Sequence, residues 1–221
     1  MHIEPGFVAP IKVTMANAGA IAVILWGCKE QIKETIVKPW VPLKSLLAAA
    51  FFSFFMESYS ISVGPSELHF IGAMVMYLIL GFTPTLIGFG AGLLFQGLIF
   101  NPGDLYHLGV NSLTLIIPLL GVHYLSGHKY FSQSSQKRLS WRRILELDII
   151  YYSGVTAMVG FWLVIGDVAT PISAWATWAS SYLAIVILEP IFTYLLVKLL
   201  KAMRNHALVS RLTVINTLYV T

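Results

Sequence analysis

The sequence predicts an all-α membrane protein, a polytopic bundle of about seven transmembrane helices with its N-terminus outside and its C-terminus in the cytoplasm. The first observation behind this prediction is composition, because 57% of the 221 residues are hydrophobic and only 11% are charged. The mean hydropathy of +0.77 points the same way. A soluble domain cannot cover that much apolar surface, so composition indicates a polytopic membrane protein.

The second observation is a series of seven apolar runs separated by short polar or turn-forming segments. We expect membrane spans at about residues 13–28, 45–61, 69–80, 85–100, 109–125, 144–165 and 174–200. The third run is short. The fourth is rich in glycine, which predicts packing against other helices rather than against lipid. We expect one transmembrane domain over residues 1–221, ending in a short cytoplasmic tail at 205–221.

The third observation is the distribution of charge, which alternates between successive connections. Basic residues concentrate in the segments 29–44 and 128–143 and in the tail from 201 onward. The connections at 62–68, 101–108 and 166–173 carry acids and no Lys or Arg, and the one at 81–84 is an uncharged turn expected on the inner side. By the positive-inside rule the basic segments face the cytoplasm, which leaves Met1 outside. The formal charge of +4 therefore reflects topology, and nucleic acid is not an expected partner.

The first two residues, Met1 and His2, form the most specific motif in the chain. The free terminal amine, the His2 amide and the His2 imidazole are joined through adjacent atoms, so they can close two chelate rings around one metal ion. The three nitrogens then lie roughly in a plane, a geometry that suits nickel or copper. Without further donors, a histidine at position 2 is more often a solvated terminal residue.

One in-plane position of this chelate stays open, and His69 is the best candidate to fill it. It lies on the same predicted side of the membrane as His2, as does His107. A planar set of four nitrogens favours nickel or low-spin cobalt over zinc, which prefers a tetrahedron. The candidates for an additional ligand, or for a residue that supports the ligands, are His107, Glu67, Ser66 and Asn111.

Other polar residues have more ordinary interpretations. Asn111 and Gln96 are expected to form hydrogen bonds between helices rather than to bind metal. Glu189 is an intramembrane acid of unknown role, because a functional group and a tie between helices are about equally consistent with its place before Pro190. The histidines expected to be structural or solvated are His123, His128 and His206.

Four segments of the chain match a known pattern: Met1-His2-Ile3 followed by Gly6-Phe7, GPSELHFIG at 64–72, GDLYHLGVN at 103–111 and Ile187-Leu188-Glu189. In these segments the sequence resembles the CbiM/NikM-type membrane component that captures the substrate of energy-coupling-factor cobalt and nickel ABC transporters. The resemblance implies that the metal binds to the amine of Met1, to the amide and imidazole of His2, and to His69. It leaves open whether the metal is cobalt or nickel.

The resemblance also implies a transport subunit of a bacterial plasma (inner) membrane rather than an enzyme. Its expected partners are a transmembrane scaffold subunit, ATP-binding ABC subunits, a small accessory membrane subunit and membrane lipid. The sequence contains no Gly-x-x-x-x-Gly-Lys-[Ser/Thr] phosphate-binding loop, so ATP hydrolysis is assigned to the partner subunits. Cobalt or nickel is then the transported substrate, and no cofactor is expected.

Two other classes of protein fit the sequence less well. An intramembrane haem protein for electron transfer would use histidines on facing helices as axial ligands, and His69 with His107 is the pair available. That alternative gives no reason for the N-terminal motif. A membrane metalloprotease would need a His-Glu-x-x-His helix, which the sequence lacks.

Overall fold

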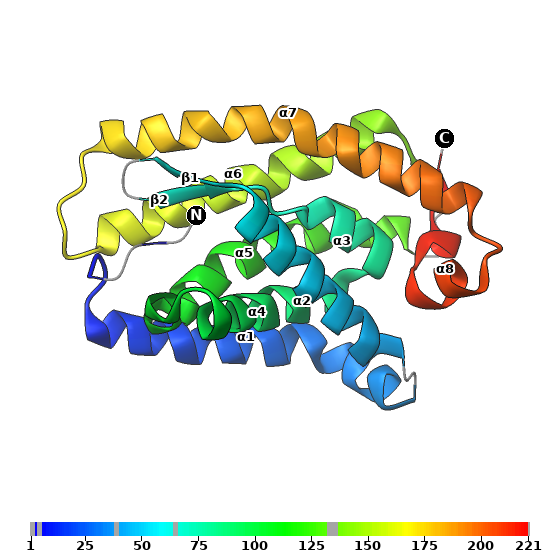
Figure 1. Cartoon of the computed structure of the whole chain (residues 1–221), viewed down its shortest axis with the longest axis horizontal. Helices are drawn as coiled ribbons and strands as arrows, with labels where there is room; N and C mark the ends of the chain where they lie inside the picture. Colours follow the sequence, from blue (N-terminus) through cyan, green and yellow to red (C-terminus); the bar gives the residue numbers. More distant parts are fainter. Residues whose placement is uncertain (1–2, 4–5, 38–39, 64–65, 132–136, 221) are drawn as a thin grey trace.

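Long helices run side by side along one axis, so the connections of the chain gather at two opposite ends (Figure 1). The computed structural model describes residues 3, 6–37, 40–63, 66–131 and 137–220. The long helices are α1 (Pro10–Val37), α2 (Trp40–Ser58), α4 (Phe82–Ile99), α5 (Leu108–Val122), α6 (Trp141–Ile165) and α7 (Ile172–Ala202). Helix α5 is extended by η1 (Pro102–His107) before it and by η2 (His123–Gly127) and η3 (His128–Tyr130) after it.

Six segments in the described part of the chain are long and apolar enough to cross a membrane. They correspond to six of the seven predicted spans, and the helices mostly extend past the predicted limits. Helix α1, for example, continues from the predicted end near residue 28 to Val37. An apolar run marks only the part of a helix inside the hydrocarbon, so the helix itself continues into the polar segment.

The third predicted span, at 69–80, is built differently. Its first residue ends strand β2, and helix α3 (Ala73–Leu80) has only 8 residues. Such a helix is about 12 Å long, less than half of the roughly 30 Å hydrocarbon core. Residues 73–79 are all buried, so protein rather than lipid surrounds α3. Non-helical backbone at this depth is tolerated because neighbouring helices satisfy its polar groups.

A β-hairpin precedes α3, where the sequence predicted only an outer loop. Strand β1 (Ser60–Val63) pairs antiparallel with β2 (Ser66–His69). The hairpin lies next to α7 in Figure 1. The indole N–H of Trp178 on α7 donates a hydrogen bond to the Glu67 carbonyl at 3.3 Å, which ties β2 to that helix.

The glycine-rich helix α4 packs closely against α2, as predicted. A Cβ atom added at Gly88 would lie 2.5 Å from the Ala48 Cβ, and one at Gly92 would lie 2.6 Å from the Phe52 ring. Residue numbers at the contacts rise in the same direction along both helices, from Ala48 and Gly88 to Phe52 and Gly92. Helices α2 and α4 therefore run parallel. Because a parallel pair needs a return segment between its members, β2 and α3 together carry the chain back through the bundle.

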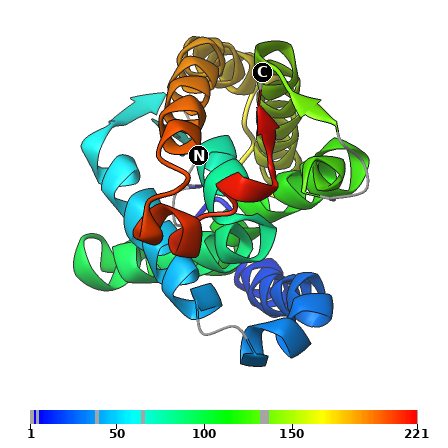
Figure 2. The same cartoon turned by 90° about the vertical axis from the view of Figure 1, so that its right-hand side faces the viewer.

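The predicted cytoplasmic tail at 205–221 folds back onto the bundle. Its described part contains α8 (Ala207–Leu212), η4 (Ile215–Thr217) and β4 (Tyr219–Val220), and β4 pairs in parallel with β3 (Arg138–Leu139). Figure 2 shows this segment lying across one end of the helices. The Val214 N–H donates to the Ile79 carbonyl at 2.7 Å, and Ile215 and Leu218 are buried.

The outer surface of α7 is apolar. Ile187, Ile191, Leu195 and Leu199 recur at intervals of four residues, and each is between 44% and 65% exposed. A spacing of four places the side chains on one face of a helix. An exposed apolar stripe of this length fits contact with membrane hydrocarbon rather than with water.

Candidate metal centre

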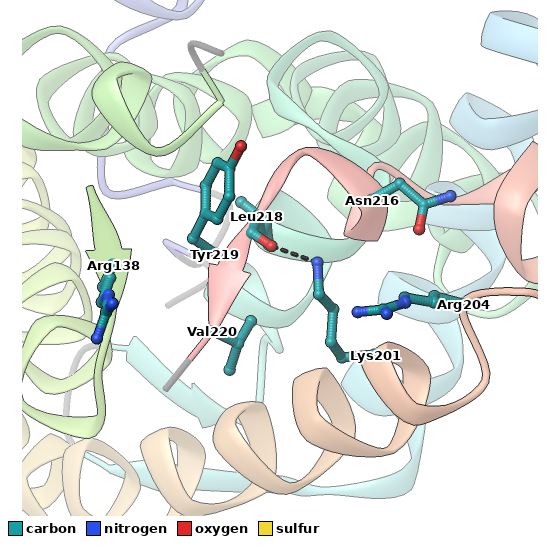
Figure 3. A pocket seen from close by; sticks show the side chains of 7 residues that line it. All are labelled: Arg138, Lys201, Arg204, Asn216, Leu218, Tyr219 and Val220. Carbon is teal, nitrogen blue, oxygen red and sulfur yellow. Dashed lines mark hydrogen bonds between the residues drawn. The ribbon is translucent and has the colours of Figure 1, made fainter. Parts of the chain in front are cut away.

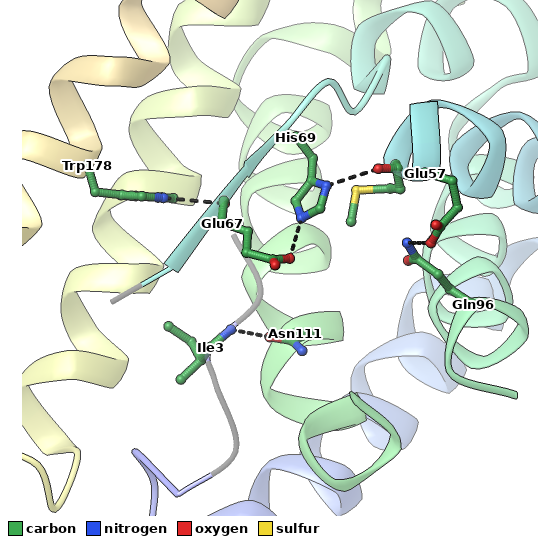
Figure 4. Close-up of polar contacts among 8 residues, drawn as sticks. Ile3, Glu57, Glu67, His69, Gln96, Asn111 and Trp178 are labelled. Carbon is green, nitrogen blue, oxygen red and sulfur yellow. Dashed lines mark hydrogen bonds and ion pairs between the residues drawn. The ribbon is translucent and has the colours of Figure 1, made fainter. Parts of the chain in front are cut away.

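The backbone of Ile3 is held inside one end of the bundle, beside the hairpin (Figure 4). Its N–H donates to the Asn111 side-chain oxygen at 3.0 Å, and its carbonyl accepts from His107 Nδ1 at 2.9 Å. Ile3 also forms an antiparallel bridge with Ser66 at the start of β2. The side chain of Ile3 is only 1% exposed. Three separate contacts therefore fix a residue that is one bond away from His2.

His69, at the end of β2, is oriented through both ring nitrogens. Nδ1 lies 3.1 Å from the Met56 carbonyl and Nε2 lies 3.0 Å from a Glu67 carboxylate oxygen. A carbonyl can only accept, so Nδ1 carries the proton there, and Nε2 is the ring nitrogen that faces Glu67. Histidines that bind metals commonly donate their other ring N–H to a backbone carbonyl in this way. The Met56 carbonyl could not be found from sequence, because every residue supplies one.

His107 is oriented by the same principle. Its Nδ1 donates to the Ile3 carbonyl, which leaves Nε2 with the lone pair. The residue is fully buried, and no hydrogen-bond partner for Nε2 is found among the described residues. His107 thus holds the N-terminal segment with one nitrogen and presents the other inside the protein.

The structure brings together the predicted residues that it describes at this end. His69, Glu67 and Ser66 share strand β2, while His107 and Asn111 reach the same segment through Ile3. Met1 and His2 lie outside the described residues. Within the ranges from 3 to 220 that are described, no group of three or more His, Cys, Asp or Glu side chains is arranged to hold a metal ion.

The same end contains Lys12, a basic residue among the acids. Its ammonium lies 2.8 Å from the Asp167 carboxylate and also donates to the Ile165 carbonyl at 2.7 Å. The Asp167 N–H donates to the Phe7 carbonyl at 2.9 Å. We call this region, comprising Ile3, Lys12, the β1–β2 hairpin, η1 and Asp167, the histidine end.

Glu189 binds the start of α3 rather than a candidate ligand. Its carboxylate accepts from the N–H groups of Gly72 at 3.3 Å and Met74 at 3.4 Å, and from the Tyr152 hydroxyl. A carboxylate at a helix N-terminus satisfies unpaired N–H groups and interacts favourably with the helix dipole. Gly72 has a φ of +65° and lies against Phe51, so the turn requires glycine. Glu189 therefore ties α7 to the short helix α3 inside the bundle.

The remaining histidines lie at the opposite end. The His123 ring stacks on Phe82 with centroids 3.9 Å apart, and its Nδ1 lies 3.0 Å from the Tyr77 hydroxyl. His128 contacts the His123 carbonyl and His206 is exposed. Gln96 forms the predicted bond between helices, donating to Glu57 on α2 at 2.7 Å.

Comparison with known proteins identifies the family. Residues 2–207 match the sequence pattern of the CbiM family, described as the cobalt uptake substrate-specific transmembrane region. The chain belongs to this family. CbiM proteins are components of transporters rather than enzymes, so the chain is a multi-pass membrane component of metal uptake. The metal is the substrate of that process.

Two solved structures share the fold of this CbiM protein. A structure titled as a transition metal transporter has a TM-score of 0.70 and 22% sequence identity, covering 94% of this chain and 96% of the other. A truncated transition metal transporter has a TM-score of 0.70 and 23% identity, covering 92% of this chain and 99% of the other. No curated protein matches the sequence.

Proposed function

We propose that the chain is the substrate-capturing membrane subunit of an energy-coupling-factor ABC transporter that imports cobalt or nickel into a bacterial cell across the plasma membrane. The metal is bound by the amine of Met1, the amide and imidazole of His2, and Nε2 of His69. Membership of the CbiM family supports metal uptake over the haem-binding alternative.

The observation that carries the proposal is the anchoring of Ile3 beside β2. Its bridge to Ser66 is antiparallel, so a chain that continues in register from Ile3 toward the N-terminus runs along β2 from Ser66 toward His69. The terminal amine is at most about 7 Å of extended chain from the Ile3 nitrogen. The anchored position of Ile3 and the direction of its bridge therefore support a chelate that the imidazole of His69 completes.

The other polar residues support this centre. Asn111 and Ser66 position the backbone of Ile3, and His107 does so through Nδ1 while its buried Nε2 is available as an additional ligand. Glu67 lies against the His69 nitrogen that must bind the metal, so it takes part in exchanging a proton for the ion. Metal binding and proton release are then linked at the His69–Glu67 pair.

The proposed orientation puts the histidine end outside and the end with most of the basic residues in the cytoplasm, following the positive-inside rule. ATP hydrolysis is supplied by partner ABC subunits, coupled through a transmembrane scaffold subunit and joined by a small accessory membrane subunit.

The test is to displace the terminal amine without changing the fold. A variant with two glycines added before Met1 should lose nickel and cobalt binding by more than about a hundredfold, because the chelate loses its amine. The same glycines inserted after Asn205, in the exposed turn between α7 and α8 at the opposite end, provide the matched control. Binding is measured by isothermal titration of the purified protein, with the mature N-terminus confirmed by mass spectrometry. Equal affinity in the two variants would refute the proposed ligand set.

A further inference from the structure

A cavity of about 550 Å³ opens at the end of the bundle opposite the histidine end (Figure 3). Its walls come from three parts of the chain: Arg138 on β3, Lys201 and Arg204 at the end of α7, and Asn216 and Tyr219 in the C-terminal segment. Because β4 pairs with β3 here, the folded tail forms part of the wall of the cavity.

The cavity has a strongly cationic lining. Arg138, Lys201 and Arg204 contribute three positive charges, and no carboxylate of the described residues lines it. Figure 3 shows Arg204 directed toward Lys201, with Arg138 on the other side. The Lys201 ammonium is held in place by the carbonyl groups of Ile215, at 3.0 Å, and Leu218. Like charges brought together around a concave surface attract an anion.

The cavity also lies where a membrane helix leaves the hydrocarbon. Helix α7 has 31 residues and is therefore about 46 Å long, which exceeds the roughly 30 Å hydrocarbon core. Lys201 is in its last turn. The exposed apolar stripe on α7 continues to Leu199 and Met203, which are 55% and 44% exposed. The cationic cavity and the apolar stripe thus reach the same end of α7, with Lys201 and the stripe on different sides of the helix.

We propose that this cavity binds the phosphate group of an anionic phospholipid in the membrane leaflet at this end, with the acyl chains along α7. Arginine suits this ligand because its planar guanidinium contacts two phosphate oxygens at once. The bound phosphate bridges β3, α7 and the C-terminal segment, so the lipid stabilises the folded tail. The adjoining apolar stripe favours a lipid over free phosphate as the source of the anion.

The test measures lipid binding by the full chain in a nonionic detergent. Native mass spectrometry detects the bound lipid during titration with phosphatidylglycerol. The double variant Arg138→Gln/Arg204→Gln removes two cations of the cavity. The control, Lys137→Gln/Arg142→Gln, removes two exposed cations of the same end that do not line it. Since each cation near a membrane surface contributes about fivefold to binding an anionic lipid, the cavity variant should bind about thirtyfold more weakly. The control should change by less than about threefold.

Further experiments distinguish a bound lipid from other anions. The single variant Arg204→Gln should bind phosphatidylglycerol about fivefold more weakly. It provides a second measurement on a milder change. Displacement of phosphatidylglycerol by an equal concentration of inorganic phosphate would overturn the lipid assignment in favour of a soluble phosphate. Equal loss in the cavity and control variants would overturn the site. Unchanged lipid binding together with loss of a co-purified transmembrane scaffold subunit would assign the cavity to an acidic protein partner instead.

Discussion

The two ends of the bundle use histidine in different ways. At the histidine end, His69 and His107 each have Nδ1 against a backbone carbonyl, which directs Nε2 toward polar groups or the protein interior. At the other end, the His123 ring is stacked on Phe82 and bonded to the Tyr77 hydroxyl, so it serves packing. The environment of the ring, rather than its presence in a span, distinguishes a candidate ligand from a structural residue.

The ends also hold the two termini of the chain in different ways. Buried side chains from η1 and α5 bind the backbone of Ile3, so its position depends on two specific residues. The C-terminal segment is held mainly through backbone pairing and through Lys201. We expect substitutions at the histidine end to change metal binding. Substitutions at the other end should instead change stability and contacts with lipid or partners.

The largest difference between the ends should appear on removing single imidazoles. His69→Ala should abolish nickel and cobalt binding, because it removes the proposed fourth nitrogen. His123→Ala should leave affinity within about twofold, since distant sites act independently. Isothermal titration of the two purified variants makes the comparison. Loss of binding in His107→Ala together with normal binding in His69→Ala would move the fourth ligand to His107.

A second prediction concerns Glu189, which lies between the two ends. Glu189→Ala should lower the free energy of unfolding by about 3 kcal/mol, because it leaves N–H groups at the start of α3 without an acceptor. Glu189→Gln retains an acceptor oxygen at nearly the same volume and should cost about 1 kcal/mol. Thermal unfolding in detergent measures both. A cost of Glu189→Gln equal to that of Glu189→Ala would show that the charge, and not the hydrogen bonds, stabilises α3.

A smaller effect is expected from the residue that holds Ile3. Asn111→Leu leaves the buried Ile3 N–H without its acceptor, which costs about 1–3 kcal/mol. We expect metal affinity to fall by about tenfold as the N-terminal segment loses its position. Gln96→Leu removes another buried amide at the same end and should change affinity by less than about twofold. Equal affinities in the two variants would contradict the anchoring role of Asn111.

The smallest effect on metal binding should follow removal of the C-terminal segment. Deleting residues 205–221 exposes the Ile79 carbonyl and removes the buried side chains of Ile215 and Leu218, so the melting temperature should fall. Metal affinity should stay within about twofold, because the deleted residues lie at the opposite end. A loss of affinity as large as that of Asn111→Leu would show that the two ends are coupled.

The sequence by itself determined the class of the protein and most of its helices. Apolar runs and the distribution of charge are local properties, so six of the predicted spans correspond to long helices in the described part of the chain. The metal-binding motif of Met1 and His2 is also local, because its donors belong to adjacent residues. The chelate stays a prediction, since both residues lie outside the described part.

Only the tertiary structure decided how Ile3 is held and how the third predicted span is built. Asn111 holds a backbone group 108 positions away, and Glu189 accepts from one 117 positions away. In both contacts the donor is a backbone N–H, which every residue except proline has. No pair of residue types therefore marks these contacts in the sequence. The physical reason is that a buried backbone N–H must find an acceptor wherever the fold places one. The folded tail and its cationic cavity depend likewise on the pairing of β3 with β4, in which Arg138 and its partner Tyr219 are 81 positions apart in the chain.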